Sequence, residues 1–229
     1  MDEVLVAYYA RHFRLMIPVL GFAVYSQFSK ADRLLTSIDY PVEHLVIVDN
    51  SGQKSWQPKK PENVKNLWFL QIPFGLGLVG AWNLIIKSTP YASYWVLVND
   101  DASFERGALE IIAEKVDPEA LNFVDIIPQW SCVVFGEAAI AKAGLYDERF
   151  YPLYFDDNDL HRRMENAGVK VHQIQAKVHH ENSSSLAGKT EQNNRTYDSN
   201  RKLLDKKIIE NDFSPGYWDL TVRRANRWD

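Results

Sequence analysis

Three consecutive polar residues, Asn99, Asp100 and Asp101, directly follow the apolar run of residues 94–98 (YWVLV). A short apolar run of this kind predicts a buried strand, so the three side chains fall at its carboxyl end. Ligands of open α/β sheets bind at that edge, and neighbouring carboxylates there suit a hard divalent cation that also contacts substrate phosphates. The alternative is a plain strand-to-turn junction, because Asn and Asp favour turns.

A second acidic cluster, which contains Asp156 and Asp157, lies in the second half of the chain, and the pair His179 and His180 follows it. A metal site, a carboxylate base and a histidine in this order suggest chemistry on a nucleotide-activated substrate. Asp157 could instead cap a helix, a role that is compatible with that of a base. If the histidines end a strand, their side chains alternate, so one of them is expected at the metal.

The composition indicates one α/β domain. The chain has 229 residues, 46% of them hydrophobic, which is enough for one sizeable core. Its net charge of −4 excludes a global positive field that would attract nucleic acid or anionic lipid. The single cysteine, Cys132, excludes an intrachain disulfide and a cysteine-built zinc site, and its apolar neighbours predict a buried small side chain.

We expect a soluble, cytoplasmic protein that is at most peripheral to a membrane. The first residues lack the basic start of a secretory signal, and no uncharged apolar stretch approaches the roughly 18 residues that cross a bilayer. The basic segment 223–228 could contact an anionic surface or an acceptor, and the alternative is a solvated terminal tail.

Alternating apolar and amphipathic segments must position these side chains, and they predict a mainly parallel sheet flanked by helices, with right-handed crossovers. In the first half, strands are expected at residues 16–24, 44–48, 67–72 and 94–98, and helices at residues 30–37, 81–85 and 106–115. In the second half, strands are expected at residues 122–128, 131–135 and 169–178, and helices at residues 137–143, 159–166 and 201–210. Residues 182–194 are rich in Ser, Gly and Asn and predict a mobile loop.

Six segments occur in an order that resembles a known family. They are residues 46–51, 75–83, 97–101, 143–150, 154–160 and 178–180, with Arg162 and Gly168 before the last. The chain resembles, over residues 17–185, the inverting, metal-dependent glycosyltransferases of the GT-A (Rossmann-like) fold, in the family-2 group that includes bacterial rhamnosyl- and galactofuranosyltransferases. The resemblance implies a catalytic domain at residues 1–185, with residues 186–229 as a mobile loop, helix and tail that pack on the same domain.

The resemblance places a nucleotide sugar at the first strands. Asp49 would accept an N–H from a uracil- or thymine-type base, with Asn50 beside it, and Tyr25 would cover the base or ribose. The glycines from Gly75 onward would allow close approach of the backbone, and Asn83 would add a polar contact. The alternatives are core packing for Tyr25 and a tight strand-to-helix turn for the glycines; a dinucleotide fingerprint fits poorly, because the glycines follow the third strand.

The resemblance also assigns the metal and the sugar. Asp101 would bind Mn²⁺ or Mg²⁺ directly, while Asn99 would contact the ribose or a metal-bound water, and Asp100 would line the nucleotide site. Asn99 departs from the family's usual acid at that position, which removes one charge. A histidine of the pair would complete the metal shell; we favour His180 over His179.

The acidic pair matches the family's general base, with Asp where the first position is commonly Glu. Asp157 would remove the proton from an acceptor hydroxyl, and Asp156 would orient the acceptor or neighbouring loops. Trp130 falls where a sugar pocket would form, so its ring could stack on a sugar; the alternative is a core tryptophan.

Three other functions share part of this pattern. A sugar nucleotidyltransferase would carry a Gly-rich, Arg-containing loop after the first strand, where this chain has Tyr25 and residues 26–29 (SQFS). A non-catalytic relative would bind a sugar nucleotide or glycan without turnover, and the presence of both Asp101 and Asp157 argues against it. The acidic balance gives little support to a glycosyltransferase acting on modified DNA. The donor could be a UDP-, dTDP- or GDP-sugar, and the acceptor a glycan, a protein or a lipid-linked hydroxyl.

Overall fold

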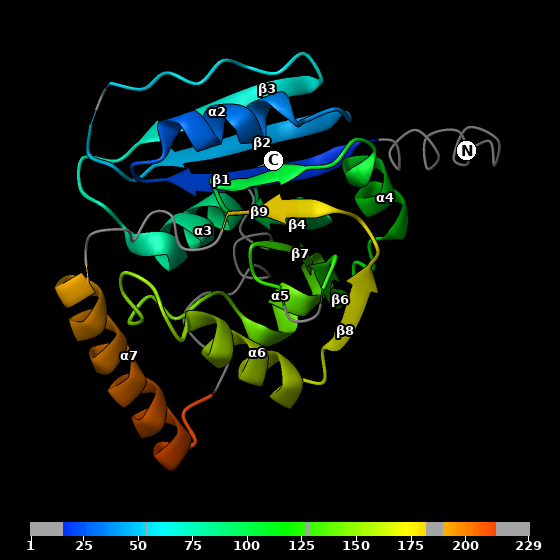
Figure 1. The fold of residues 1–229 in the computed structure, drawn as a ribbon. Helices are drawn as coiled ribbons and strands as arrows, with labels where there is room; N and C mark the ends of the chain where they lie inside the picture. The colour runs from blue at the N-terminus through cyan, green and yellow to red at the C-terminus, as the bar shows by residue number, and fades with distance from the viewer. Residues whose placement is uncertain (1–15, 54, 127–128, 182–189, 214–229) are drawn as a thin grey trace, which may run out of the picture.

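The computed structural model describes residues 16–53, 55–126, 129–181 and 190–213, and in this part of the chain a seven-stranded sheet forms the centre (Figure 1). The strand order is β3-β2-β1-β4-β7-β6-β8. The strands are β1 (Ile17–Val24), β2 (Val42–Asp49), β3 (Val64–Gln71), β4 (Tyr94–Val98), β6 (Ala120–Val124), β7 (Cys132–Gly136) and β8 (Lys170–Ile174). A second, two-stranded sheet pairs β5 (Ala102–Phe104) with β9 (Val178–His180).

The expected α/β class with a mainly parallel sheet is confirmed. Strands β3, β2, β1 and β4 are parallel, β7 is antiparallel to both of its neighbours, and β6 is parallel to β8. The ends of the first strands are in register, because Val24 pairs with Asp49 and Asp49 with Gln71. The carboxyl ends of β1, β2 and β4 therefore meet at one edge of the sheet.

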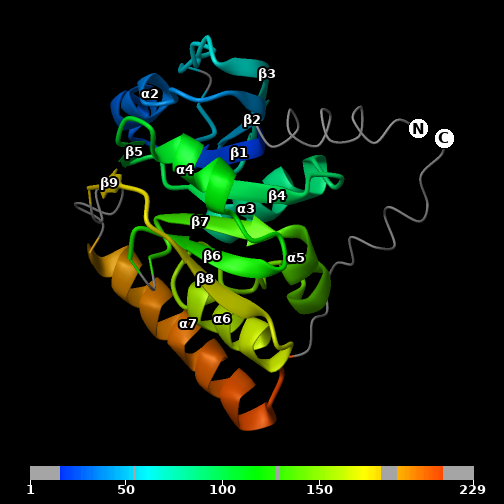
Figure 2. The same cartoon turned by 90° about the vertical axis from the view of Figure 1, so that its right-hand side faces the viewer.

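Different helices cover the two faces of the sheet (Figures 1 and 2). One core contains apolar side chains of α2 and α4, and the other contains those of α3, α5 and α6. The helices are α2 (Phe28–Thr36), α3 (Gly77–Ser88), α4 (Ala108–Lys115), α5 (Glu137–Ala143), α6 (Asp156–Asn166) and α7 (Thr190–Glu210). Because β1 and β4 bury side chains on both faces, their sequences are almost continuously apolar.

Several expected boundaries differ from the structure. The single strand expected at residues 169–178 is divided into β8 and β9, and β5 was not expected at all. Helix α6 begins at Asp156 rather than Asp159, so both acids of the pair lie in its first turn. Helix α7 begins at Thr190, inside the segment expected as a loop. The remainder of that loop, residues 182–189, and the basic segment 223–228 lie outside the described residues.

Two further expectations concern the cysteine and membrane-spanning helices. Cys132 is buried and free, as its neighbours predict. Among the described helices, none is long and apolar enough to cross a bilayer.

Helix α7 lies at the end of the molecule opposite β3 and α2 (Figures 1 and 2), and a buried lysine joins it to the rest of the chain. Lys207 Nζ lies 2.6 Å from Asp147 Oδ2 and 2.6 Å from Asp159 Oδ1, and all three side chains are almost fully buried. Asp159 is also paired with Arg163, whose Nε lies 2.9 Å from Asp159 Oδ2. Lys207 therefore attaches α7 to α6, the helix that begins with the acidic pair.

Replacing this lysine tests the attachment. Lys207→Met should lower the free energy of unfolding by about 3–5 kcal/mol, because two buried carboxylates each lose a buried cation and keep one arginine, Arg149 for Asp147 and Arg163 for Asp159. The matched control is Lys206→Met, one residue earlier, where the side chain is 67% exposed and the change should stay within about 0.5 kcal/mol. Denaturation in urea measures both, and equal losses for the two variants would contradict the attachment.

Candidate functional site

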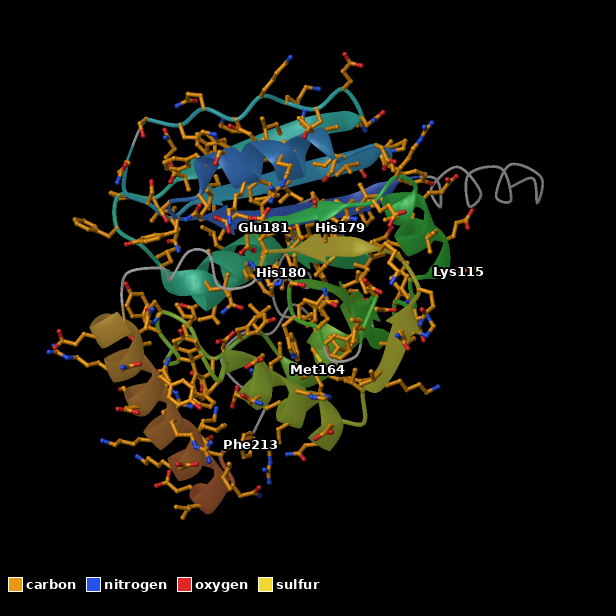
Figure 3. All side chains as sticks on the ribbon, in the orientation of Figure 1. Lys115, Met164, His179, His180, Glu181 and Phe213 are labelled. Atoms are coloured by element: carbon orange, nitrogen blue, oxygen red, sulfur yellow. The ribbon has the colours of Figure 1, made fainter. Side chains whose placement is uncertain are left out.

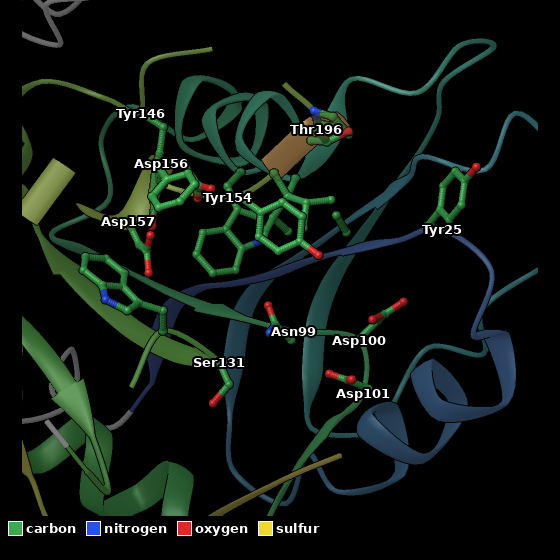
Figure 4. Close-up of a pocket in the computed structure, with 18 of the residues that line it drawn as sticks. Tyr25, Asn99, Asp100, Asp101, Ser131, Tyr146, Tyr154, Asp156, Asp157 and Thr196 are labelled. Carbon is green, nitrogen blue, oxygen red and sulfur yellow. The ribbon is translucent and has the colours of Figure 1, made fainter. Parts of the chain in front are cut away.

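A cavity of about 1300 Å³ opens at the carboxyl edge of the parallel strands. The ends of β1, β2 and β4 contribute Tyr25, Asn50 and the segment 99–101, while the start of α6 and the side of α7 contribute the facing wall. Figure 4 shows Asp100 and Asp101 on one side of this cavity and Asp156 and Asp157 on the other. The fold thus brings two acidic clusters from distant parts of the chain to one cavity.

The pairing of β5 with β9 places a histidine beside the first cluster. Ala102 pairs with His180 in the antiparallel register, so the residue before Ala102, Asp101, lies next to the histidine ring. The His180 Nε2 atom is 3.0 Å from Asp101 Oδ1 and 3.4 Å from Asn99 Nδ2. Asn99, Asp101 and His180 all line the cavity.

The other histidine of the pair points away from the cavity. Successive strand residues alternate between faces, so His179 is 72% exposed, with its Nε2 4.0 Å from a carboxylate oxygen of Glu105, whereas His180 is 19% exposed. The next residue, Glu181, forms ion pairs with Lys30 at 2.7 Å and Arg33 at 2.6 Å on α2. Figure 3 labels these three consecutive residues at the end of β9 and directly after it. The ion pairs hold the end of β9 against α2 and so keep its histidine in place.

On the side of the cavity formed by the segment 99–101, burial disfavours the ionised form of Asp100. Removal from water, followed by the nearby charge of Asp101, raises the pKa of Asp100 to about 7. Hydrogen bonds from backbone N–H groups and the charge of Lys30 oppose the shift and are outweighed. A cation bound here would favour the ionised form, so the acidic cluster is suited to positive charge.

Asp101 and His180 place a carboxylate oxygen and an imidazole nitrogen, both common metal ligands, close together. Two adjacent ligands of an octahedral ion with bonds of 2.0–2.1 Å lie about 2.9 Å apart, close to the 3.0 Å that separates Asp101 Oδ1 from His180 Nε2. Within the described residues, no group of three or more His, Cys, Asp or Glu side chains could hold a metal ion. An ion at this pair would take its remaining ligands from water and substrate oxygens, as Mg²⁺ commonly does.

The acidic pair on the facing wall begins helix α6. The backbone immediately before it is unusual, because Tyr154 (φ 79°) and Phe155 (φ 66°) both adopt the left-handed conformation. Burial, followed by the charge of Asp157, raises the pKa of Asp156 to about 7, and burial also raises the pKa of Asp157. The positive end of the helix dipole and local backbone N–H groups oppose these shifts without reversing them. A carboxylate with a raised pKa is a better proton acceptor than an ordinary one.

Trp130 and Tyr25 both line the cavity. The Trp130 ring packs edge-on against Phe123, 5.1 Å between centroids, and lies 6.1 Å from His161 on α6. Trp130 therefore packs against the core and faces the cavity at once. Tyr25 is 45% exposed beyond the end of β1, so core packing, the alternative for this residue, does not describe it.

Asn50 shapes the glycine loop as well as lining the cavity. Its Oδ1 accepts the N–H of Leu76 at 2.5 Å, and its Nδ2 donates to the carbonyl of Gly77 at 2.9 Å. Gly77 has a φ of +72°, and a Cβ there would lie 2.8 Å from the carbonyl oxygen of Pro152. Gly75 lines the cavity, where a Cβ would lie 3.1 Å from the carbonyl oxygen of Asn50. The glycines thus permit close backbone packing at this end of the cavity.

Two predicted nucleotide contacts lie outside the cavity lining. Asp49 is buried, and its Oδ1 accepts hydrogen bonds from the N–H and hydroxyl of Ser51. Asn83 is also buried and exchanges two hydrogen bonds with the backbone of Tyr146, while its Nδ2 donates to Glu148. In the structure both side chains support neighbouring backbone rather than face the cavity.

The structure adds lining residues that the sequence analysis missed. The aromatic ones are Trp82, Tyr146, Tyr151, Tyr154, Phe155 and Tyr197, and α7 also contributes Asn193, Arg195, Thr196 and Ser199. Figure 4 shows Thr196 of α7 at the edge of the cavity. Two sequence signals point to the loop residues: Tyr154 and Phe155 fall in the segment 154–160 that resembles the family, and aromatic side chains are dense just before the acidic pair. Nothing in the polar sequence of α7 predicts which element it packs against.

Comparison with known proteins relates the fold to solved structures. No protein-family model and no curated protein sequence matches the chain. S. aureus TarS matches with a TM-score of 0.55 and 13% identity, over 71% of this chain and 36% of TarS. GalNAc-T7 in complex with UDP, GalNAc and Mn²⁺ matches with a TM-score of 0.57 and 10% identity, over 72% of this chain and 44% of GalNAc-T7.

A third match covers a larger share of the matched structure. TarS residues 1–349 in complex with UDP-GlcNAc gives a TM-score of 0.54 and 13% identity, over 71% of this chain and 57% of that one. This chain therefore spans less than two thirds of each of these proteins. The neighbours are GT-A glycosyltransferases, so the chain has the GT-A fold; at these identities the likeness concerns the fold alone.

The raised pKa of Asp156 has a consequence for stability. An Asp in an unfolded chain has a pKa near 3.9, so the folded protein holds the proton of Asp156 more tightly than the unfolded chain does. The raised pKa therefore adds its full contribution to the free energy of unfolding below about pH 4, and this contribution is lost as the pH rises through about 7. Asp156→Asn should therefore match the wild type at pH 4 and exceed it at pH 8, by up to about 4 kcal/mol in the ligand-free protein.

Denaturation in urea at the two pH values measures the effect. Asp205→Asn, on the exposed part of α7, is the control for the amide substitution and should show no such dependence. A variant at position 156 that is less stable than the wild type at pH 8 would contradict the cost assigned to this buried charge.

Proposed function

We propose that this protein is a metal-dependent, inverting glycosyltransferase that moves a sugar from a nucleotide-sugar donor to an acceptor hydroxyl. One observation carries the proposal: Asp101 with His180, and Asp156 with Asp157, line facing walls of one cavity at the carboxyl edge of the sheet. The first pair suits the cation and diphosphate of the donor. The second suits removal of a proton from the acceptor.

The donor would bind between the ends of β1, β2 and β4. Tyr25 would cover the base or ribose, Asn50 and Gly75 would bring backbone close to the donor, and Asn99 and Asp100 would line the ribose and phosphate region. We infer a UDP-sugar as the first donor to test, because structures with the same fold hold UDP-GlcNAc or UDP. dTDP- and GDP-sugars are the other candidates.

Asp101 and His180 would hold Mn²⁺ or Mg²⁺. When bound, the ion would neutralise charge on the leaving nucleoside diphosphate. His180 would bind the ion through Nε2 as a neutral imidazole. Asn99, whose Nδ2 lies 3.4 Å from the same Nε2 atom, would then contact the ribose or a metal-bound water. His179 is not assigned to the metal because its side chain points to solvent on the other face of β9.

Asp157 would act as the general base. Its carboxylate would take the proton of the acceptor hydroxyl while that oxygen forms a bond to the anomeric carbon. The bond from the same carbon to the phosphate oxygen breaks, and the electron pair leaves with the nucleoside diphosphate. Attack from the face opposite the phosphate inverts the configuration. Asp156, more deeply buried beside it, would orient the acceptor, and Trp130 would contact a sugar ring.

Substitutions of Asp101 and of the two histidines test the metal site. Asp101→Ala should abolish the Mn²⁺-dependent part of UDP binding, and His180→Ala should weaken Mn²⁺-dependent binding at least about 10-fold. His179→Ala is the matched control and should change it little, because that ring is 72% exposed and faces away. Calorimetry with UDP in Mn²⁺ and in EDTA gives the answer. Wild-type affinity that is equal in both would exclude the metal site.

The base is tested by a nearly isosteric change. Asp157→Asn should keep donor binding and lower turnover by about 10²–10⁴-fold, because the amide cannot accept the proton. Turnover of the wild type should also fall as the pH is lowered through the raised pKa of Asp157, which must be ionised to act.

The anomeric configuration of the product tests the same assignment independently. Donor sugars that thermally stabilise the protein with Mn²⁺ are offered with acceptor panels, and the product is examined by NMR. An inverted linkage agrees with a single displacement assisted by Asp157. A retained linkage, or unchanged turnover in the Asn variant, would rule out this base.

A further inference from the structure

The wall of the cavity beside Asp157 carries aromatic rings from two distant segments. Tyr151, Tyr154 and Phe155 come from the loop that precedes α6, and Tyr197 comes from α7. We call these four side chains the aromatic wall. Two of them are strongly exposed, Tyr151 at 55% and Tyr197 at 47%. Large exposed rings inside a cavity offer an apolar surface to a ligand.

The aromatic wall is held in one arrangement by contacts between its two segments. The Tyr197 ring lies 4.7 Å from Phe155 and 5.6 Å from Tyr154, centroid to centroid. Tyr154 and Phe155 adopt positive φ values, which bulky residues rarely do and which cluster at ligand sites.

Asn200 of α7 fixes the loop that carries these rings. Its side chain is buried, and Nδ2 donates to the carbonyl oxygen of Leu153 at 2.7 Å. The same Nδ2 lies 3.3 Å from the carbonyl oxygen of Tyr151 and 3.4 Å from that of Tyr154. Three carbonyls of one short loop thus converge on a single amide, and α7 determines where the aromatic wall stands relative to the acidic pair.

The groups around the space between Asp157 and the aromatic wall indicate which kind of ligand fits there. A group beside Asp157 must present a hydroxyl to the carboxylate, while the rings require a face of C–H bonds against their electron-rich surfaces. A pyranose ring offers both on one small, rigid unit. The diphosphate end of the nucleotide is assigned to the side of the cavity where Asp100 and Asp101 lie, across from Asp156 and Asp157.

We propose that the aromatic wall is the binding subsite for a pyranose ring of the acceptor, so that the acceptor is a glycan. This rests on the proposed function, because it takes Asp157 as the base. Tyr197 stacks on the sugar and is supported by Tyr154 and Phe155. Tyr151, whose hydroxyl donates to the carbonyl oxygen of Gly75 at 3.3 Å, contacts the sugar at the border with the donor site. Asn200 is a positioning residue that acts through the loop.

Saturation-transfer NMR tests the subsite on the full chain with UDP and Mn²⁺ present. The probes are the methyl pyranosides of glucose, N-acetylglucosamine, galactose, mannose and rhamnose. At least one should bind the wild type, with transfer strongest at the C–H protons of one ring face. Tyr197→Ala should raise its Kd about 5- to 10-fold, the loss expected for one aromatic stacking contact. Tyr197→Phe keeps the ring and should bind like the wild type.

Two further variants complete the test. Tyr151→Ala, with the other strongly exposed ring of the wall, should weaken the same pyranoside and gives a second measurement should Tyr197→Ala fail to fold. Tyr91→Ala is the matched control, because Tyr91 is 51% exposed and is not among the residues that line the cavity. It should leave the Kd unchanged.

Parallel titration with UDP separates this proposal from the proposed function. A wild type that binds UDP but none of the pyranosides overturns the glycan subsite and points to a peptide or lipid hydroxyl. Equal pyranoside affinity in the wild type and in the Ala variants also overturns it. A protein that binds a pyranoside through Tyr197 but does not bind any nucleotide keeps the subsite and overturns the transferase.

Discussion

The cost of burying negative charge governs this molecule. Asp147 and Asp159 are buried and share the cation of Lys207, and hydrogen bonds from Arg149 and Lys207 outweigh the effect of burial and lower the pKa of Asp147 to about 2. Asp100 and Asp156 are buried beside other carboxylates instead, and their pKa values rise to about 7. The paired carboxylates, Asp147 and Asp159, stabilise the fold. The other two, Asp100 and Asp156, line the cavity, where a carboxylate with a raised pKa can bind a cation or transfer a proton.

The same lysine links stability to the site. Lys207 and Asn200 lie on α7, a largely polar helix, and they attach it to α6 and to the loop before α6. The loop continues into the acidic pair, so α7 positions the aromatic wall and the chain segment that leads into α6. A helix that adds little to the main core therefore completes the cavity. The residues that follow β1, β2 and β4 line the cavity without contributions from α7.

Local patterns predicted the parallel half of the fold and the two acidic clusters. Residues 94–98 are apolar because β4 is buried on both faces, and the polar residues after it mark the edge of the sheet. The pairing of β5 with β9 could not be predicted, since three-residue strands leave no periodic signal, and this pairing alone decides that His180 rather than His179 faces Asp101. A local pattern also does not show where a side chain points. Asp49 lies at a strand end as predicted, but its carboxylate accepts hydrogen bonds from Ser51 and does not line the cavity.

The central claim is that a metal and a nucleotide diphosphate share one wall of the cavity while Asp157 faces them across it. Anomalous scattering from Mn²⁺ in crystals grown with UDP tests this most directly. The account predicts a peak within coordination distance of Asp101 and of the His180 Nε2 atom, with the diphosphate beside it and the aromatic wall left open. A peak elsewhere, or UDP bound against Tyr197 instead, would contradict it.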